Sequence, residues 1–307
     1  ALMPDAHSGY GLPIGGVLAT ENAVIPYGVG VDIGCRMSLS IFDLPASFLK
    51  GRDQQLEAIL AEHTKFGMYE THQIKADHEI FYRPEFKDIP FVKGLLDKAY
   101  KQLGTSGGGN HFVEFGIVKI EAPLAEWKLV PGEYFAVLSH SGSRGLGANI
   151  AKQYTYLATK QCPLPKNVQQ LAWLDLNTHD GQEYWMAMNL AGDYAKACHE
   201  DIHRRIAKIL GKRVVVTIEN HHNFAWKEVH HGRECIVHRK GATPAAEGQL
   251  GIIPGSMTAP GYIVMGKGNP ESLNSASHGA GRVFSRAKCK TMFTPVSYTH
   301  LTLPTKA

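Results

Sequence analysis

The pattern of hydrophobic and polar residues along the chain predicts short strands mixed with a few helices. Runs rich in β-branched and aromatic residues, each bounded by Gly, Pro or Asn, are typical of strands. They lie at residues 17–20, 38–42, 112–118, 134–139, 213–219, 234–238 and 262–265. Helical spacing is found at residues 91–103, 147–159 and, most clearly, 184–210, where apolar residues recur every three or four positions. Gly211 is a plausible stop for that last helix.

The order of these elements decides the expected fold class. Strands and helices follow one another irregularly, without the repeated βαβ units of a doubly wound sheet, so we predict the α+β class. We expect one large mixed domain over residues 1–293. Residues 294–307 contain two prolines and no helical period, and we expect a tail that is disordered or not native. The chain begins without Met inside the segment LMPDAHSGYG, which predicts a piece of a longer protein.

Composition and charge narrow the class of protein only slightly. The 307 residues are 44% hydrophobic and 20% charged, as in soluble globular proteins. No apolar run approaches the roughly 20 residues that span a bilayer, so we expect no membrane partner. A net charge of +4 tolerates a polyanionic partner without requiring one. Five scattered cysteines form no CxxC pair, which favours a reducing compartment and a cytoplasmic location.

Five residues could together hold metal ions. Asp32 and Cys35 lie three residues apart in a glycine-rich segment, although a buried Cys after a glycine is usually part of a core. His111, His140 and His222 each lie at a predicted strand end beside glycine, asparagine or serine. Five ligands exceed what a closed tetrahedral zinc site takes, which suggests a binuclear site bridged by the thiolate. Ligand softness favours zinc or iron, and the residues by themselves do not name the metal.

Glycine-rich loops suggest that the protein handles phosphate groups. Glycine stands beside basic or hydroxyl residues at residues 141–145, 239–243, 254–257, 266–269 and 277–282. Successive backbone N–H groups in such loops can face phosphate oxygens. Each loop alone is ordinary surface chemistry, but together they favour this interpretation. Neither GxxxxGK[ST] nor a GxGxxG between a strand and a helix is found, which disfavours P-loop and dinucleotide-binding proteins.

An HExxH motif supports a rival interpretation. His199 and His203 have the spacing that places two zinc-binding imidazoles on one face of a helix, with a general base between them. However, the pair flanks Cys198 and Ile202 on the apolar stripe and is followed by two arginines, as on a partly solvated helix flank. A metalloprotease therefore remains an alternative that the motif alone does not establish.

Taken together, several motifs resemble the RtcB family of RNA ligases over nearly the whole chain, from about Leu2 to about Phe293. They are MPDAHSGYG, VGVDIGCRM, LGTSGGGNHFVEFG, LSHSGSRG, NHHNF, RKGAT, IPGSM and GKGNPESLNSASHGAGRVFSRAK, in the family's order. The resemblance implies a single α+β catalytic domain with its metal site at strand ends. It also implies GTP-dependent joining of RNA 3′-phosphate or 2′,3′-cyclic phosphate ends to 5′-hydroxyl ends, in tRNA splicing or RNA repair.

The resemblance also assigns roles to individual residues. It implies a guanylylated His278 oriented by Asp5, and two manganese ions on Asp32, Cys35, His111, His140 and His222, with Cys35 shared. GTP contacts are implied for Asn110, His111, Phe112, Val113, Glu114, His222, Asn223, Pro254, Gly255, Ser256, Met257, His278, Gly279, Ala280 and Gly281. Contacts with RNA or nucleotide phosphates are implied for Arg144, Arg239 and Lys240.

The chain also departs from the family's pattern. Tyr10 stands where many members have lysine, Pro244 follows RKGAT, and Gly261 replaces a hydroxyl-bearing residue near the nucleotide. Family members extend further at both ends, and nothing after Phe293 resembles their C-terminal part, which ends in a lysine that contacts guanine. An accessory activating factor is a further possible partner. The alternatives are a metal-dependent phosphoesterase, an HExxH metalloprotease and a non-catalytic, metal-stabilised RNA-binding module.

Overall fold

The fold is described from a computed structural model of the chain, which describes all residues except 74–76, 257–258, 285–287, 289–290 and 293–307. The strands are β1 Leu2–His7, β2 Ile14–Thr20, β3 Ala23–Val24, β4 Arg36–Pro45, β5 Lys65–Phe66, β6 Thr105–Gly107, β7 Phe112–Ile120, β8 Gly132–Ser141, β9 Leu174–Asp175, β10 Val214–His221, β11 Phe224–His230, β12 Arg233–Lys240, β13 Ala242–Pro244, β14 Leu250–Ile253, β15 Tyr262–Met265 and β16 Ser275–Ser277. The α-helices are α1 Pro26–Val29, α2 Asp53–His63, α3 Glu85–Asp88, α4 Pro90–Lys93, α5 Leu96–Gln102, α6 Arg144–Gln161 and α7 His179–Leu210. Short 3₁₀ turns are η1 Ala46–Leu49, η2 Glu79–Tyr82, η3 Ala125–Trp127, η4 Gln169–Leu171 and η5 Pro270–Ser272.

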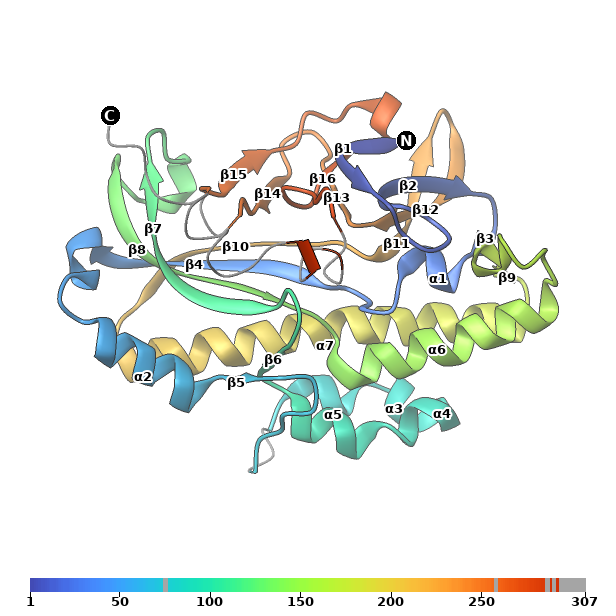
Figure 1. Cartoon of the computed structure of the whole chain (residues 1–307), viewed down its shortest axis with the longest axis horizontal. Coiled ribbons are helices and arrows are strands. Elements are labelled where there is room, and N and C mark those ends of the chain that lie inside the picture. The colour runs from blue at the N-terminus through green and yellow to red at the C-terminus, as the bar shows by residue number, and fades with distance from the viewer. Residues whose placement is uncertain (74–76, 257–258, 285–287, 289–290, 293–307) are drawn as a thin grey trace.

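A four-stranded antiparallel sheet, in the order β10-β4-β8-β7, forms the middle of the molecule (Figure 1). Alternate residues of each strand face opposite sides of a sheet. On one side, Phe42, Phe135 and Val137 pack against Ile202 and Ile206 of the long helix α7. On the other side, an apolar layer that includes residues of β4 and β10 packs against the β14-β15 hairpin. The central sheet is therefore covered on both faces, by α7 below and by small sheets above.

A second four-stranded sheet, in the order β1-β2-β12-β11, lies above one end of α7 (Figure 1). Its strands β2 and β12 are antiparallel and aligned over five residue pairs. Two-stranded pairs link the rest of this layer, with β13 beside β16 and β14 beside β15. The short connection from β10 to β11 joins the two large sheets along the chain. Four of the glycine-rich loops that the sequence singles out begin in this layer, at residues 239–243, 254–257, 266–269 and 277–282, whereas the loop at residues 141–145 follows β8 of the central sheet.

Helix α7 is the longest element, and its sequence explains both its ends. The Thr178 side chain accepts a hydrogen bond from the Gly181 amide at the N-terminus, as a helix N-cap does. Gly211 ends the helix in the left-handed conformation at φ 61°, which a residue without Cβ adopts at low cost. Helix α6 packs beside α7, and both contribute to the largest apolar core. The predicted stop at Gly211 is confirmed.

The predicted elements are found with shifted bounds and some omissions. The mixed architecture confirms the α+β class, and every predicted strand overlaps an observed one. The helix expected at residues 91–103 is instead two short helices, α4 and α5, because the Leu95 amide bonds to Val92 in a tighter turn. Helix α2 and strands β11 and β14 were not predicted. The expected boundary at residue 293 lies outside the described residues. No helix in the described part of the chain is long and apolar enough to cross a membrane.

Candidate metal centre and its surroundings

One end of the central sheet gathers the five predicted metal ligands. Cys35 directly precedes β4, His111 directly precedes β7, and His222 directly follows β10. His140 lies near the end of β8. In the strand register it is opposite residues at the start of β4 and of β7. Because neighbouring strands are antiparallel, the start of one and the end of the next meet at the same edge. The strand-end location of the site, predicted from sequence, is thus confirmed.

The five side chains form two overlapping groups that share Cys35. Cys35, His140 and His222 form one group, and Asp32, Cys35 and His111 form the other; the ligand atoms of each lie within 4.8 Å of one another. The Cys35 Sγ atom lies 3.1 Å from His140 Nε2 and 3.5 Å from His111 Nε2. The His140 and His222 Nε2 atoms are 3.3 Å apart, and His111 Nε2 lies 2.8 Å from Asp32 Oδ2. We call these five residues the His-Cys cluster.

The opposite ring nitrogens indicate which atoms are free to bind an ion. His140 Nδ1 donates to the Asn110 carbonyl at 2.9 Å, which leaves the Nε2 lone pair directed at the cluster. The Nδ1 atoms of His111 and His222 are buried and have no hydrogen-bond partner among the described residues. In both rings the Nε2 atom faces the cluster, so an ion held there would bind Nε2 and not these Nδ1 atoms. Thiol, carboxylate and imidazole donors around a shared sulfur fit a pair of divalent ions.

Burial shapes the protonation of the cluster. It lowers the pKa of His140 to about 4, aided by the nearby His111, and lowers the pKa of His222 well below its ordinary value. The imidazoles are therefore neutral and can donate lone pairs. Burial and the Asp32 carboxylate raise the pKa of the Cys35 thiol well above its ordinary value. A thiolate at this position consequently requires a nearby cation, as at metal sites.

The Asp32 carboxylate packs directly against the backbone of Gly142. A Cβ atom at residue 142 would clash with both carboxylate oxygens of Asp32. Burial opposes ionisation of Asp32, but its interactions with His111, Cys35 and His140 together outweigh burial, so the Asp32 pKa lies below its ordinary value. A larger residue at position 142 would therefore displace the Asp32 carboxylate, which explains the glycine after the LSHS segment.

His278 and Asp5 form a second pair next to the cluster. The His278 Nδ1 atom lies 2.8 Å from Asp5 Oδ2, and the Gly279 amide donates to the same oxygen at 3.2 Å. The ring centroids of His278 and His222 are 5.0 Å apart. Burial of Asp5 opposes its ionisation, yet its pKa lies below its ordinary value because the interactions with His278, with Ser277 and with the backbone together outweigh burial. A carboxylate on Nδ1 fixes the neutral ring with its lone pair on Nε2.

The loops predicted to contact GTP lie around this pair. Gly279 lies against Pro254, and Gly281, at φ 71°, lies against the backbone of Asp5. Asn223 is also left-handed, at φ 57°, and its side chain accepts from the Gly241 amide at 2.8 Å. The loop at residues 254–256 therefore neighbours the His278 loop. The predicted contact Met257 lies outside the described residues.

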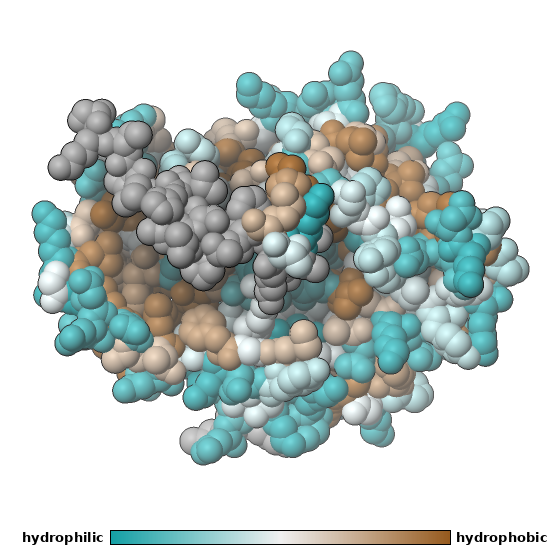
Figure 2. Space-filling model, in the orientation of Figure 1, coloured by the Kyte–Doolittle hydropathy of each residue, from teal (hydrophilic) through white to brown (hydrophobic). Residues whose placement is uncertain are grey.

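An apolar hollow opens beside β7. It has a volume of about 670 Å³, and its lining includes Glu114, Ile117, Trp127, Leu138 and Tyr262. Figure 2 shows hydrophobic side chains gathered over β7 and β8, at the left of the view. Partial desolvation raises the pKa of Glu114 above its ordinary value.

The predicted GTP contacts on β7 divide between the two faces of the strand. Phe112 packs its ring 5.8 Å from that of His140. Val113 faces the opposite way, into the core between the sheet and α7. Only the backbone of Val113 can therefore contact a ligand on the side of the hollow.

Arg144 lies at the rim of the cluster. Its Nε donates to Thr105 Oγ1 at 3.0 Å and one Nη donates to the Gly67 carbonyl at 2.9 Å, and both of these acceptors are neutral oxygens. A surface hollow of about 620 Å³ is lined by Arg144 together with Asp32 and His111. Arg144 therefore lines a hollow that reaches from the cluster to the surface. It has no carboxylate partner among the described residues.

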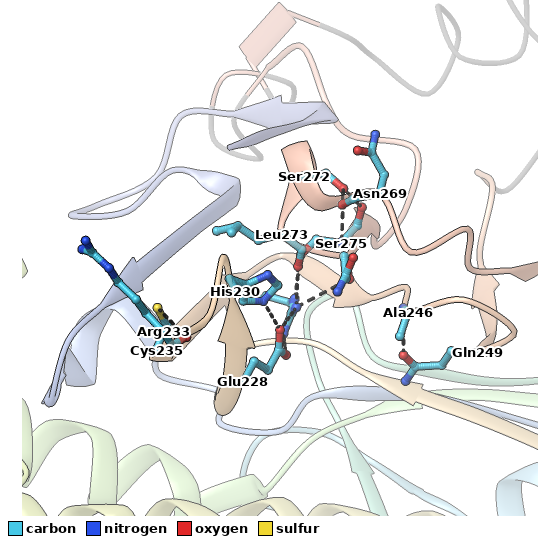
Figure 3. A network of polar contacts seen from close by, with 12 residues as sticks. Glu228, His230, Arg233, Cys235, Ala246, Gln249, Asn269, Ser272, Leu273 and Ser275 are labelled. Atoms are coloured by element: carbon cyan, nitrogen blue, oxygen red, sulfur yellow. Dashed lines mark hydrogen bonds and ion pairs between the residues drawn. The ribbon is translucent and has the colours of Figure 1, made fainter.

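Arg239 has a different environment, and the structure does not place it beside the cluster. Its guanidinium is fully buried and binds Glu228 through two hydrogen bonds of 2.5 and 2.9 Å. It also donates to Ser275 Oγ and to the Leu273 carbonyl. Figure 3 shows Glu228 on its strand facing the loop that carries Leu273 and Ser275. These contacts join β11 and β12 to that loop and leave the guanidinium enclosed.

Lys240 is buried without a carboxylate partner among the described residues. Its Nζ donates to the carbonyls of Tyr10 at 2.6 Å and Tyr27 at 3.1 Å, and lies 4.4 Å from the centre of the Tyr27 ring. Burial lowers the pKa of Lys240 to about 8. Its side chain approaches Gly30 and hence the glycine-rich segment before Asp32.

The HExxH motif lies on the other face of the central sheet. His199 and His203 are buried, which corrects the expectation of a partly solvated flank, whereas Glu200 is exposed and pairs with Lys196. Both imidazoles bond to Ser139 Oγ, at 2.6 and 2.7 Å. Among the described residues, neither histidine belongs to a group that could hold a metal ion. The sequence pattern had identified these residues without indicating their partner.

The fold and the site define an α+β protein with a candidate metal centre of thiol, carboxylate and imidazole groups and a carboxylate-bound histidine beside it. Over residues 1–88 and 85–302 the sequence matches the family described as tRNA-splicing ligase RtcB. RNA-splicing ligase RtcB1 of Escherichia coli ATCC 25922 and RNA-splicing ligase RtcB of strain K12 are each 36% identical, over 95% of this chain and 76% of the relative. The tRNA-splicing ligase RtcB of Archaeoglobus fulgidus is 32% identical over 94% of this chain and 73% of its own length. The chain therefore belongs to the RtcB family of RNA ligases, and it is an enzyme of that class.

Proposed function

We propose that this enzyme joins RNA 3′-phosphate or 2′,3′-cyclic phosphate ends to 5′-hydroxyl ends at the expense of GTP, with His278 as the nucleophile. The observation that carries the proposal is the Asp5 carboxylate on His278 Nδ1, next to a cluster of metal-binding residues. A neutral imidazole held in this way presents the Nε2 lone pair to an electrophile. Histidine is one of the side chains that form covalent intermediates in group transfer.

The proposed reaction has three phosphoryl transfers. His278 Nε2 attacks the α-phosphorus of GTP, so that an N–P bond forms and the bond to pyrophosphate breaks. An oxygen of the RNA 3′-phosphate then attacks the same phosphorus, and the N–P bond breaks to free His278. Finally the 5′-hydroxyl attacks the activated 3′-phosphate, loses its proton and displaces GMP. A cyclic phosphate end must first be hydrolysed to the 3′-phosphate. Asp5 orients the imidazole throughout and stabilises its N–H, as carboxylates do for catalytic histidines elsewhere.

Two manganese ions would be held by the His-Cys cluster, one by Asp32, Cys35 and His111 and the other by Cys35, His140 and His222. When bound, such ions polarise phosphoryl oxygens and neutralise developing charge. Manganese is assigned from the family resemblance, since thiol and imidazole donors alone would favour a softer ion. The protein's own contribution is to hold the donors in place: Asn110 fixes the His140 ring and the backbone at Gly142 leaves room for Asp32.

The GTP site is proposed where the loops around His278 meet the start of β7. The hollow beside Glu114 is apolar along most of its wall, and its volume of about 670 Å³ lies in the range of small-molecule binding pockets. The residues proposed to contact the nucleotide are Asn110, His111, Phe112, Val113, Glu114, His222, Asn223, Pro254, Gly255, Ser256, Met257, His278, Gly279, Ala280 and Gly281. Arg144 and Lys240 are proposed to face phosphates, because neither has a carboxylate partner among the described residues. Arg239 is given a structural role instead, because Glu228 occupies its guanidinium.

Covalent labelling tests the assignment of His278. The protein is incubated with manganese and GTP labelled at the α-phosphate, and then separated by denaturing electrophoresis. The label is expected to travel with the protein, to be released by acid and to survive alkali, as a phosphoramidate does. It is expected to be lost in His278→Ala and retained in His179→Ala, a control at an exposed histidine. A label that persists in His278→Ala, or a wild-type protein that is never labelled, would contradict the proposal.

An end-joining assay separates ligation from the alternative activities. RNA with a labelled 3′-phosphate end is mixed with RNA bearing a 5′-hydroxyl, GTP and manganese. The ligase is expected to retain the labelled phosphate in a longer RNA, whereas a phosphoesterase would release it as inorganic phosphate. A binding module would retard the RNA on a gel without either change. The physiological RNA, an accessory activating factor and a cytoplasmic location stay predictions.

A further inference from the structure

The HExxH residues take part in a buried chain of hydrogen bonds below the His-Cys cluster. Ser40 of β4 lies 2.7 Å from His203 Nδ1, and His203 Nε2 lies 2.7 Å from Ser139 Oγ of β8. Ser139 Oγ lies 2.6 Å from His199 Nδ1, and His199 Nε2 lies 3.2 Å from the Ser141 carbonyl. All five residues are buried. We call this chain of four contacts the Ser-His relay.

The last contact determines the direction of all the others. A carbonyl oxygen only accepts, so His199 Nε2 must donate to Ser141, and in a neutral ring Nδ1 must then accept. Ser139 therefore donates its single hydroxyl proton to His199. Ser139 Oγ in turn accepts from His203 Nε2, and the remaining His203 Nδ1 accepts from Ser40. One arrangement thus satisfies every polar atom in the relay with two neutral imidazoles.

Reversing any hydrogen bond would require a charged ring. If Ser139 donated to His203 instead, both nitrogens of His199 would have to donate, which makes His199 a cation. Burial and the nearby Arg36 oppose that charge and lower the pKa of His199 well below its ordinary value. Burial likewise lowers the pKa of His203 to about 4. The neutral relay is therefore the state expected near neutral pH.

The relay contacts β8 on both sides of one cluster residue, His140. Ser139 and Ser141 flank His140, and in a strand their side chains face α7 while that of His140 faces the opposite side. The Ser141 hydroxyl also donates to the Ser106 carbonyl, which lies in β6 on the chain leading to His111. In the strand register, Ser141 is paired with Arg36, the residue after Cys35. The relay thus fixes the strand end from which His140 projects.

We propose that His199 and His203 are positioning residues for the metal centre, acting through Ser139 and Ser141 to hold the end of β8 and so the aim of His140. The inference rests on the proposed role of His140 as a metal ligand. It gives the HExxH motif a function in this protein that does not involve binding metal itself. Groups that orient metal ligands from outside the coordination shell typically change metal affinity by about 10- to 100-fold when removed.

Side-chain substitutions that keep one contact at a time test the route of this effect. The amide of His199→Gln can reach the Ser141 carbonyl in place of Nε2, whereas His199→Asn can only replace Nδ1 toward Ser139. We expect His199→Leu and His199→Asn to weaken manganese binding about tenfold. His199→Gln is expected to restore most of that loss. Ile206→Val is the matched control, because Ile206 packs on the same face of α7 without touching the relay.

Manganese affinity is measured by titration, and the stability of each metal-free variant by urea denaturation. A purely structural role would lower stability in all four variants and leave the affinity of the folded protein unchanged, which would overturn the proposal. Equal loss of affinity in the Gln and Leu variants would also overturn it. A wild-type protein that binds no metal would overturn both this role and the proposed function, whereas the other two outcomes overturn this role alone.

The direction of the relay has its own measurement. Nitrogen-15 spectra of the metal-free protein at neutral pH distinguish the two neutral tautomers of histidine from the charged ring. Both His199 and His203 are expected as the neutral Nε2–H form, and each is identified by the loss of its signal in the substituted protein. An Nδ1–H tautomer or a charged ring at either residue would contradict the relay.

Discussion

The two faces of the central sheet carry similar residues in opposite states. Above the sheet, His140 and His222 face each other through Nε2 atoms 3.3 Å apart, and His140 Nε2 also lies 3.1 Å from the Cys35 sulfur. Below it, His199 and His203 are held by serines so that each donor meets an acceptor. Burial keeps the imidazoles neutral on both faces.

This difference shows that neither residue type nor burial identifies a binding site. A buried histidine whose hydrogen bonds are complete within the protein has no capacity left for a ligand. A buried histidine whose lone pair meets other lone pairs is destabilising until a cation lies between them. The same test separates the basic residues, because Arg239 is fully paired whereas Arg144 and Lys240 contact only neutral oxygens among the described residues.

The largest effect is expected for the shared ligand of the upper face. Wild-type protein should bind about two divalent ions per chain, and Cys35→Ala should lose most of both because the two groups share this sulfur. Cys198→Ala is the control, since Cys198 is also buried but lies in α7 on the satisfied side. Elemental analysis after dialysis measures the content. Full metal content in Cys35→Ala would refute the bridging role.

A large loss of stability is expected for the fully paired arginine. Arg239→Met leaves the Glu228 carboxylate without its main partner, and breaking a buried ion pair in this way costs about 3 kcal/mol or more. Adding Glu228→Gln should recover part of the loss, because the unpaired charge is then removed. Urea denaturation in the presence of a chelator measures both. Unchanged stability combined with weaker RNA binding would instead return Arg239 to the phosphate site predicted from sequence.

A smaller effect is expected for the arginine at the rim of the cluster. Arg144→Ala should weaken RNA binding roughly tenfold for all base sequences, because phosphate contacts position a nucleic acid without reading it. The salt dependence of binding should become shallower by about one unit. Arg233→Ala, at an exposed arginine of β12, is the control. A loss confined to certain end sequences would indicate base recognition and contradict the assignment.

The sequence predicted the site more fully than it predicted the fold around it. Local sequence was sufficient to predict that four of these residues lie at strand ends. Each of Cys35, His111, His140 and His222 follows or precedes a β-branched run beside glycine or asparagine. Strand order was not predictable, because β10 pairs with β4 although the 168 residues 46–213 separate the two strands in the chain. The four-residue strand β14 contains a glycine and is too short for its alternation to stand out from a loop.

Some side chains have surroundings that the sequence did not indicate, for physical reasons. The family resemblance implied a phosphate contact for Arg239, whose carboxylate partner lies across the β11-β12 hairpin and becomes visible only in the fold. His199 and His203 were placed on a solvated flank because two arginines follow them. In the fold those arginines turn outward to bind Asp201, while the histidines face the sheet. Helical periodicity indicates a face but not what covers it.

The smallest effect is expected from the buried lysine, and it appears as a dependence of stability on pH. Burial lowers the pKa of Lys240 from its ordinary value of 10.5 to about 8. Between these two pH values the unfolded chain keeps a proton that the folded protein has lost. The free energy of unfolding contributed by Lys240 therefore rises with pH across this window. Below about pH 8 both states are protonated, and the cost of burying the ammonium is constant.

Comparison with Lys240→Met isolates this contribution, because methionine keeps the apolar stem and does not titrate. The wild-type free energy of unfolding, relative to that of the variant, should rise by at most about 1.4 kcal/mol per pH unit between pH 8 and 10.5. The exposed Lys212→Met serves as the control and should show no such slope. If Lys240 faces a phosphate, an anion bound there favours the ammonium form, so adding GTP should flatten the wild-type slope. If the slope is absent without GTP, interactions within the protein already offset the cost of burying the ammonium. Lys240 would then resemble Arg239, whose charge is paired inside the protein.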